Sequence, residues 1–313
     1  MSTRAVPRAH AARVAAQAKV NLRLRILARE TSGYHQLETL FLRLALADDV
    51  LVQVTMGARS LDVAGDVDAR QLGPTERNLA WRAADAYATA TGWPAGFAIE
   101  LTKRIPVGGG LGGGSADAGA VLRALDAMAP KPVGEPALLA IAARLGADVP
   151  FLASTSAFAL AWGRGERLLT LAAPDERELL LVLPPFAVST AEAYGWLAAL
   201  RESGDRHDSA DAAIDRLDAA TLADWATIAR LATNDFERVV AARHPAVSSV
   251  LERLRGLGCA PAMLSGSGST IFGVLPRAMR VDVPRFEGAH GGPAPKVVLT
   301  HSATVVEPVV PVG

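Results

Sequence analysis

Alternation of apolar and polar residues predicts most of the strands in this chain. In the segment 20–27, leucine and isoleucine alternate with asparagine and arginine, a pattern typical of an antiparallel strand with one buried face. Shorter apolar runs predict further strands over residues 49–55, 97–103, 157–162, 178–183, 262–264, 270–274 and 297–306.

Helical periodicity separates these strands. Apolar residues spaced three and four apart predict helices over residues 78–90, 115–129, 135–145, 193–200 and 245–257. Gly92, Gly146 and Gly258 end three of them, and Ser189 with Glu192 forms a capping-box pattern before a fourth. Since amphipathic strands are mixed with helices, the order predicts an α+β fold rather than a doubly wound sheet.

The densest signal lies between a strand and a helix, in the segment Pro106–Ser115. Six of the seven residues from 108 to 114 are glycine. Glycine lets a backbone take positive φ and approach a ligand closely, and a helix that begins there offers free N–H groups and a positive dipole end. The segment is therefore predicted to hold a phosphate. A flexible linker is the alternative, but linkers are flanked by polar sequence rather than by a strand and a helix.

Two familiar phosphate motifs fit this loop poorly. The spacing Gly108-x-Gly110-x-x-Gly113 matches a dinucleotide-binding fingerprint, although that motif follows a buried parallel strand and the strand here is amphipathic. A P-loop ends in glycine, lysine and then serine or threonine, whereas no lysine follows the glycines here. The sequence indicates a phosphate loop of a third kind.

Composition narrows the class of protein. At 313 residues, half of them hydrophobic and a fifth charged, the chain is long enough for one large domain or two closely packed ones. Lys plus Arg and Asp plus Glu are both 32, so no charge excess points to nucleic acid or to an acidic membrane. The single cysteine, Cys259, excludes an internal disulfide framework and fits the cytoplasm, and no apolar run reaches the roughly 18 residues of a membrane span.

Three other segments carry candidate chemistry. Lys19 offers an ammonium suited to a phosphate or a carboxylate, but a solvated strand residue is the alternative. Asp148 places one carboxylate in an apolar run, where a turn before Pro150 is the plainer interpretation. The run Ser265–Ser269 brings small residues and hydroxyls that suit an anion, or form a tight hairpin turn. Taken singly, these alternatives stay open.

In combination, the segments resemble the GHMP kinase superfamily, named for galactose, homoserine, mevalonate and phosphomevalonate kinases. The glycine loop alone indicates this family. The segments around Lys19, His35 and Asp148 indicate a branch that phosphorylates a cytidine diphosphate-linked methylerythritol in non-mevalonate isoprenoid synthesis. The matching segments occur in family order: Ala18–Leu22, Gly33–His35, Thr39–Phe41, Pro106–Ser115, Gly146–Pro150 and Ser265–Gly268.

The resemblance implies a fold and a division of the chain. The expected α+β fold has an N-terminal lobe like domain 2 of ribosomal protein S5 and a ferredoxin-like C-terminal lobe, with ATP and substrate between them. The first lobe, which carries the glycine loop, is expected over residues 1–160 and the second over 161–313.

The resemblance also implies catalytic and ATP-binding residues. Asp148 is expected to accept the proton of the substrate hydroxyl or to orient it, and Lys19 to offset charge on the moving phosphoryl group. Mg²⁺ is expected with ATP, but no acidic ligand is evident in the sequence and the metal site stays unassigned. The expected ATP-binding residues are Asn78, Leu79, Pro106, Val107, Gly108, Gly109, Gly110, Leu111, Gly112, Gly113, Gly114 and Ser115.

The substrate site is implied in the same way. Asn21, Tyr34 and His35 are expected to line it, with His35 on the cytosine edge. Phe41 and Tyr194 are expected to stack on the base, although core packing is the alternative for Phe41. The remaining expected substrate-binding residues are Ser265, Gly266, Ser267 and Gly268.

Two features depart from the family pattern, and other functions remain as alternatives. Ala116 stands where the family loop has a second serine, and the tail beyond Thr304 has no family counterpart.

The alternatives are another GHMP kinase of mevalonate or homoserine type, a dinucleotide-binding oxidoreductase, and an inactive nucleotide-binding scaffold. Expected partners are ATP and the small-molecule substrate, without nucleic acid or membrane, and the chain is expected to be a cytoplasmic monomer or weak homodimer.

Overall fold

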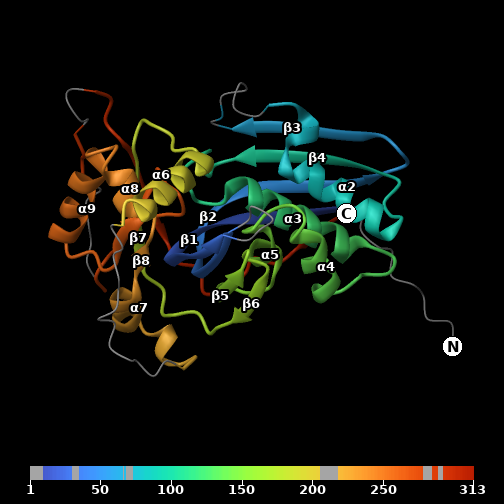
Figure 1. Ribbon diagram of the computed structural model, residues 1–313. Coiled ribbons are helices and arrows are strands. Elements are labelled where there is room, and N and C mark those ends of the chain that lie inside the picture. Colours follow the sequence, from blue (N-terminus) through green and yellow to red (C-terminus); the bar gives the residue numbers. More distant parts are fainter. Residues whose placement is uncertain are drawn as a thin grey trace.

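The computed structural model describes residues 10–29, 35–65, 67, 73–204, 218–277, 284–287 and 292–313. Two sheets, each with its own helices, lie in different halves of the molecule (Figure 1). None of the helices in these ranges is long and apolar enough to cross a membrane.

The helices and strands alternate along the chain as the mixed pattern predicts. The helices are α2 (Leu79–Thr91), α3 (Gly113–Met128), α4 (Glu135–Ala142), α5 (Val149–Ala153), α6 (Thr190–Glu202), α7 (Trp225–Leu231), α8 (Glu237–Ala241) and α9 (Ala246–Gly256), with short 3₁₀ turns η1 (Thr75–Arg77) and η2 (Thr221–Ala223). The strands are β1 (Ala11–Arg29), β2 (His35–Thr55), β3 (Arg59–Gly65), β4 (Gly96–Lys103), β5 (Phe158–Gly163), β6 (Arg167–Thr170), β7 (Glu178–Leu183), β8 (Thr233–Asn234), β9 (Ala262–Leu264), β10 (Ile271–Val274), β11 (Lys296–His301) and β12 (Val310–Val312).

Strands β1 and β2 form the long central ladder of the larger sheet. They pair antiparallel, from Ala11 opposite Gln53 to Arg29 opposite His35. Strand β1 is longer than the predicted strand over residues 20–27. Its even-numbered residues from Ala12 to Ile26 are all buried, so the alternation that predicts the strand continues toward its N-terminal end. The sheet continues from β2 through β4 to β3, while β12 and β8 pair with β1, β5 pairs with β2, and β6 pairs with β5.

The opposite face of β1 is polar, yet its centre is buried. Gln17, Lys19 and Asn21 are each at most 3 % exposed, whereas Arg13 near the start of the strand is exposed. The backbone N–H of Lys19 donates to the carbonyl of Leu111 in the glycine loop at 3.0 Å. The loop therefore covers part of this polar face, and side chains that the alternation places on a solvated face lie inside the molecule.

Helices α2 to α5 pack with the larger sheet in one hydrophobic core (Figure 1). Much of the buried surface of α2 and α3 is alanine, which lets the helices approach closely. A close approach occurs at Gly119 of α3, where a Cβ would lie 2.5 Å from the backbone carbonyl of Leu152 in α5. This contact places α5, which begins directly after Asp148, against α3, whose first residues are the last residues of the glycine loop.

The smaller sheet has the antiparallel order β11-β7-β10-β9 and packs with α6, α8 and α9 in a second core. Strands β9 and β10 pair directly, with Leu264 opposite Ile271. The run Ser265–Ser269 is therefore the turn of a hairpin, which is one of the two interpretations that the sequence leaves open. Whether the turn also binds a ligand depends on which of its residues face the cleft.

Two local predictions are wrong. The predicted strand 297–306 ends early as β11, and the chain returns to the larger sheet as β12, where Val310 pairs with Arg13. Ser189 precedes α6 but its side chain makes no capping hydrogen bond. The division of the chain at residue 160, which falls within β5, stays a prediction.

Replacing Gly119 with alanine is predicted to lower the free energy of unfolding by about 1–3 kcal/mol, because the added methyl group pushes α3 away from α5. The matched control is Gly195→Ala on α6, where nothing lies within 4 Å of the added carbon. That change should raise stability by about 0.5–1 kcal/mol, the usual gain for glycine to alanine inside a helix. Urea unfolding measures both variants, and equal effects would contradict the tight α3–α5 contact.

Candidate active site

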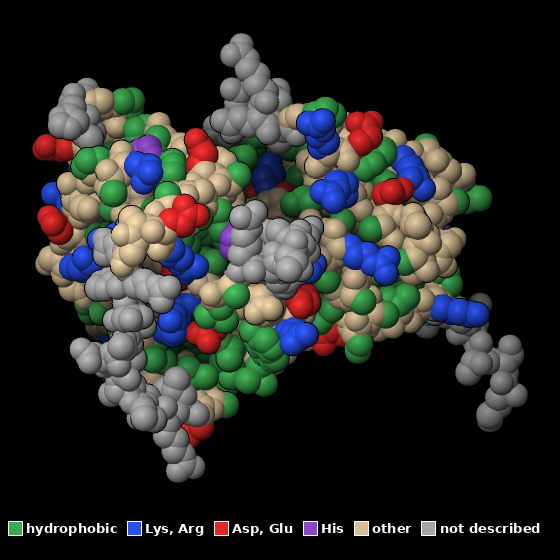
Figure 2. All heavy atoms as spheres, in the orientation of Figure 1, with side chains coloured by type: hydrophobic (Ala, Val, Ile, Leu, Met, Phe, Trp, Pro, Cys, Tyr) green, Lys and Arg blue, Asp and Glu red, His purple; other side chains and the backbone are tan. Residues whose placement is uncertain are grey.

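A cleft of about 610 Å³ is lined by residues from both halves of the molecule. The residues that line the cleft include the whole glycine loop, the predicted catalytic pair and residues of the smaller-sheet half: Lys19, Asn21, Thr39, Phe41, Asn78, Leu79, Lys103, Pro106–Ser115, Asp117, Asp148, Thr190, Tyr194, Phe236, Gly266 and Ser267. On the face of the molecule drawn in Figure 2, basic and acidic side chains are interspersed, without one large patch of a single sign.

The glycine loop runs along the cleft and ends in α3. Gly108, Gly110 and Gly112 have φ of 76°, 77° and 73°, a left-handed conformation that residues with a Cβ rarely adopt. Gly112 directly precedes the first turn of α3, and no side chain caps that turn. The first N–H groups of α3, at the positive end of the helix dipole, are therefore suited to an anionic ligand.

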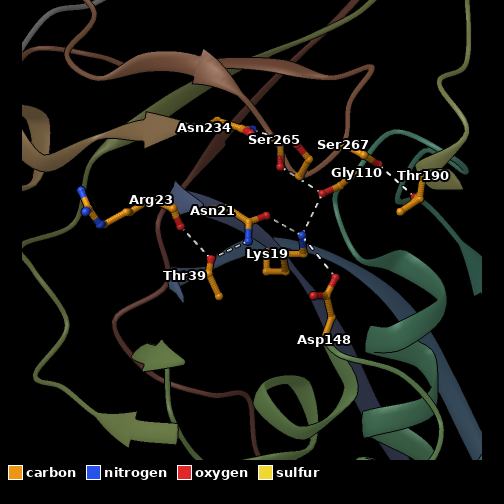
Figure 3. A network of polar contacts seen from close by, with 11 residues as sticks. Lys19, Asn21, Arg23, Thr39, Gly110, Asp148, Thr190, Asn234, Ser265 and Ser267 are labelled. Carbon is orange, nitrogen blue, oxygen red and sulfur yellow. Dashed lines mark hydrogen bonds and ion pairs between the residues drawn. The ribbon is translucent and has the colours of Figure 1, made fainter. Parts of the chain in front are cut away.

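Gly110 is the point where the smaller-sheet half touches the loop. A Cβ on Gly110 would lie 2.2 Å from the carbonyl oxygen of Ser265. The Gly110 carbonyl accepts hydrogen bonds from Ser265 Oγ and from Lys19 Nζ, both at 3.0 Å (Figure 3). Next to it, the Thr270 N–H donates to the Gly109 carbonyl at 3.2 Å. These contacts hold the loop from two sides and leave no room for a side chain.

Lys19 has an acceptor for each of its three N–H bonds. Its Nζ lies 2.7 Å from Asn21 Oδ1, 3.0 Å from the Gly110 carbonyl and 3.3 Å from Asp148 Oδ2 (Figure 3). The Lys19 side chain is 3 % exposed and that of Asp148 is 31 % exposed. The structure thus brings the two predicted catalytic residues together as a buried cation beside an accessible carboxylate.

The orientation of Asn21 is fixed by a short chain of hydrogen bonds. Its Nδ2 donates to Thr39 Oγ1 at 2.7 Å, and Thr39 Oγ1 donates to the Arg23 carbonyl at 2.7 Å (Figure 3). Because Nδ2 is engaged there, Oδ1 faces Lys19. The sequence assigns Asn21 to the substrate site, and the structure adds that its amide holds the lysine. Thr39 has this role without being predicted as a site residue.

Asn234, which lies beside Ser265 in Figure 3, organises the β9–β10 turn. Its Nδ2 donates to the carbonyls of Leu264 and Gly266, both at 2.8 Å, and its Oδ1 accepts the Phe236 N–H at 2.9 Å. No pattern in the sequence predicts this residue. It gives no signal along the chain, since all its partners are backbone groups.

The predicted substrate run Ser265–Gly268 divides between the interior and the cleft. Ser265 is fully buried and bonds the glycine loop, so it links the two halves. Gly266 and Ser267 line the cleft, and Ser267 Oγ lies 3.0 Å from Thr190 Oγ1 at the start of α6. Within this tight turn, the Ser265 hydroxyl is buried and the Ser267 hydroxyl lies at the cleft.

An aromatic wall consists of Tyr194 and Phe236, which line the cleft, together with His35, which stacks on Tyr194. The rings of His35 and Tyr194 stack at 4.3 Å with 21° between their planes, and Tyr194 meets Phe236 edge-on at 4.9 Å. Burial, followed by the charge of Asp148, raises the pKa of the Tyr194 phenol. Its hydroxyl is therefore neutral at physiological pH. Tyr34, predicted to line the substrate site, lies outside the described residues.

Three further predicted residues, Phe41, Asn78 and Leu79, line the cleft. Asn78 caps α2, because its side chain accepts the Ala80 N–H at 2.9 Å, and Leu79 lines the cleft beside it. Phe41 is 1 % exposed and stacks on Phe151 at 4.8 Å, although it reaches the cleft. This position favours the core-packing interpretation of Phe41 over stacking on a base.

A buried ionic cluster that the sequence analysis did not predict lies beside the loop. Lys103 Nζ donates to Asp117 Oδ2 at 2.6 Å and also to Asp48 Oδ2. Each of the three side chains is at most 6 % exposed. A signal existed, because Asp117 interrupts an alanine-rich helix and charged residues are rarely buried unless they are paired.

Comparison with known proteins decides the family. The models "GHMP kinases N terminal domain" and "GHMP kinases C terminal" match residues 78–165 and 212–282. A protein of Nitratidesulfovibrio vulgaris (strain Hildenborough), named 4-diphosphocytidyl-2-C-methyl-D-erythritol kinase, is 40 % identical over 262 residues, covering 83 % of this chain and 88 % of its own length. The chain belongs to the GHMP kinase family. Its enzyme class is therefore that of ATP-dependent small-molecule kinases.

Other relatives agree with this GHMP kinase assignment. A protein of the same name from Solidesulfovibrio magneticus is 42 % identical over 266 residues, covering 82 % of this chain and 86 % of its own. A crystal structure of 4-(cytidine 5'-diphospho)-2C-methyl-D-erythritol kinase aligns with a TM-score of 0.65 at 37 % identity, covering 84 % of this chain and 89 % of its own. Homoserine kinase from Cytophaga hutchinsonii shares the fold, with a TM-score of 0.61 at 19 % identity and coverage of 88 % and 87 %. The predicted family and mixed α+β fold are confirmed, and the dinucleotide-binding alternative is dropped.

In this GHMP kinase, Gly110→Ala is predicted to destabilise the fold more than Gly108→Ala. Both glycines have nearly the same positive φ, so both variants carry a backbone cost of about 1–2 kcal/mol. Only Gly110 also meets the Ser265 carbonyl, whereas nothing lies within 4 Å of a Cβ on Gly108. The clash should add about 1–3 kcal/mol. Thermal unfolding followed by circular dichroism measures the difference, and two equally damaged variants would contradict the contact.

Proposed function

We propose that the chain transfers the γ-phosphate of ATP to the 2-hydroxyl of 4-diphosphocytidyl-2-C-methyl-D-erythritol, giving the 2-phosphate and ADP. The observation that carries the proposal is the Lys19–Asp148 pair, which lies in the cleft beside the loop that leads into α3. Relatives that carry the name of this kinase are 37–42 % identical to the chain over more than four-fifths of its length.

Asp148 and Lys19 are proposed to act on the substrate hydroxyl. Phosphoryl transfer needs mainly positioning and stabilisation of charge. The Asp148 carboxylate, which faces the cleft, orients the hydroxyl and takes its proton as the new P–O bond forms. Lys19 holds that carboxylate at 3.3 Å and places a positive charge near the phosphoryl group. Asn21 and Gly110 fix the ammonium on its other sides, so the lysine has little freedom to move.

ATP is proposed to lie along the glycine loop. The triphosphate would accept hydrogen bonds from the backbone N–H groups of Val107–Ser115, which include the first turn of α3, and the adenine would lie toward Asn78 and Leu79. The positive φ angles of Gly108, Gly110 and Gly112 support this, because a backbone without Cβ atoms lets phosphates approach closely.

Mg²⁺ is proposed to accompany ATP. Within the described ranges, no group of three or more His, Cys, Asp or Glu side chains is placed to hold a metal. Magnesium commonly takes one or two carboxylates and completes its shell with phosphate and water oxygens. The accessible carboxylate of Asp148 fits that requirement. When bound, the ion would supply positive charge to the phosphates.

The cytidine part of the substrate is proposed to bind at the aromatic wall. The stacked rings of His35 and Tyr194 offer a flat apolar surface for a base, and His35 would bond the cytosine edge. Gly266 and Ser267 would lie near the rest of the substrate, together with Tyr34. A mevalonate-type or homoserine-type kinase is the alternative, and the aromatic wall favours a substrate that carries a base.

Several smaller expectations stay predictions. These are a cytoplasmic location, a monomer or weak homodimer, and the absence of a nucleic-acid partner.

The purified protein is predicted to consume ATP with 4-diphosphocytidyl-2-C-methyl-D-erythritol and not with mevalonate, homoserine or galactose, because only the first carries a base for the aromatic wall. Coupled detection of ADP measures turnover, and mass spectrometry identifies the phosphorylated product. Turnover of mevalonate or homoserine without turnover of the cytidine substrate would refute the substrate assignment and leave the kinase family intact.

Asp148→Asn is predicted to lower kcat by about 10²–10⁴-fold, the usual range for lost acid–base help. Lys19→Met should also lower kcat, and the double variant should cost less than the sum of the two because the pair acts as a unit. Lys131→Met is the matched control, since Lys131 is exposed. Steady-state kinetics measure all four variants, and strictly additive losses would mean that the two residues act independently.

A further inference from the structure

The ionic cluster beside the glycine loop holds one more negative charge than positive. Asp48 of β2 and Asp117 of α3 share the single ammonium of Lys103, at the end of β4. None of the three side chains exceeds 6 % exposure, so water screens the cluster little. A buried charge without a partner is costly, and proteins often remove it by binding a proton.

The two carboxylates are not equally satisfied. Asp48 accepts from Lys103 and, through its other oxygen, from the backbone N–H groups of Arg104 and Ile105, the latter at 2.7 Å. Asp117 accepts only from Lys103, and its Oδ1 is buried without a hydrogen-bond partner. Hydrogen bonds to the ionised form favour it, so Asp48 keeps its charge and a proton would reside on Asp117.

The electrostatic surroundings of Asp117 agree with its geometry. Burial raises the pKa of Asp117 to about 7, with Lys103 opposing the rise and the negative charge of Asp48 adding to it. A protonated Asp117 carries no charge, which removes the repulsion between the two carboxyl groups. Its ionisation state is therefore open to change near neutral pH.

Within the described part of the chain, the charges that act on Asp117 come from Lys103 and Asp48. Lys19 and Asp148 form a separate pair beside Gly112. Helix α2 presents Leu79 toward the start of α3, and Glu135 of α4 bonds Thr155 instead.

Asp117 also lies close to the place proposed for the ATP phosphates. It is four residues, about one helical turn, after Gly113, and it lines the same cleft as the glycine loop. Lys103 Nζ lies 3.4 Å from the position of a Cβ on Gly113. Phosphates at the start of α3 would add several negative charges within a few ångströms of the cluster, where charges interact more strongly than in water.

We propose that Asp117 binds a proton from solvent when ATP binds, so that ATP affinity is linked to the ionisation of this buried carboxyl group. The carboxylate becomes a carboxylic acid, and the Asp48–Lys103 pair is left neutral beside the phosphates. The proposal rests on the proposed ATP site. Asp117 is a positioning residue in this scheme, because it ties the start of α3 to Lys103 at the other end of the loop and does not touch the reacting atoms.

Isothermal titration calorimetry with MgATP, in phosphate and in Tris buffer at pH 7.5, counts the protons exchanged on binding. The wild-type protein should take up a fraction of a proton, at most about one per ATP, and its affinity should fall as pH rises from 7 to 8.5, at most about tenfold per pH unit. Asp117→Asn should remove most of this uptake and flatten the pH dependence. ATP itself can exchange protons, so the difference between the two proteins is the readout.

Asp126→Asn is the matched control on the same helix. Asp126 Oδ1 accepts from the Tyr87 hydroxyl at 2.8 Å and the Val133 N–H at 2.7 Å, and asparagine keeps that acceptor. This variant should retain the wild-type proton uptake. Equal uptake by wild type and Asp117→Asn, or no uptake by wild type, would overturn the proposal.

An infrared difference spectrum of the wild-type protein, in which the spectrum without MgATP is subtracted from the spectrum with MgATP, tests the same protonation step. This measurement does not depend on the folding of a variant. A new carbonyl band of a protonated carboxyl group should appear at pH 7.5–8, and its absence would also overturn the proposal. Absence of MgATP binding would refute the proposed ATP site as well, whereas normal binding without proton uptake refutes only the role of Asp117.

Discussion

The carbonyl oxygen of Gly110 joins the three parts of the molecule on which the cleft depends. It accepts one hydrogen bond from Lys19 of β1 and one from Ser265 of the β9–β10 turn, which uses both of its lone pairs. The Ser265 carbonyl in turn stands where a Cβ on Gly110 would be. One backbone group thus fixes the glycine loop against both the catalytic pair and the smaller sheet, and any side chain at Gly110 would separate them.

The polar interior that this arrangement creates is almost fully hydrogen-bonded. Burial of a polar group is costly unless it finds a partner, and Gln17, Lys19 and Asn21 all find theirs. Among the described residues, the buried side-chain atoms without a partner are Asp117 Oδ1 and Thr270 Oγ1. Both lie at the glycine loop, since Thr270 Oγ1 faces Gly109 and Asp117 lies in the helix that follows the loop. The unsatisfied groups therefore gather where the proposed phosphates would bind.

The two lysine–aspartate groupings beside the loop have similar components and different exposure. Lys19 pairs with a carboxylate that is 31 % exposed and faces the cleft, so this carboxylate can meet a substrate. Lys103 pairs with two carboxylates that are at most 3 % exposed, so this ionic cluster joins β2, β4 and α3 with very little exposure to solvent. Exposure, rather than residue type, separates a pair suited to chemistry from a cluster suited to holding the loop.

The sequence by itself determined the local elements and the family. Alternation predicted part of β1, the glycines between a strand and a helix predicted both the loop that leads into α3 and the family, and the motifs around Lys19 and Asp148 predicted the branch within the family. Each of these signals depends on residues close together in the chain. Only the tertiary structure decided that Lys19 meets Asp148, that Ser265 is buried while Ser267 lines the cleft, and that the tail returns to β1 as β12. Asn234 shows the physical reason: its partners are backbone groups of another segment, which every residue carries, so no pattern along the chain can reveal them.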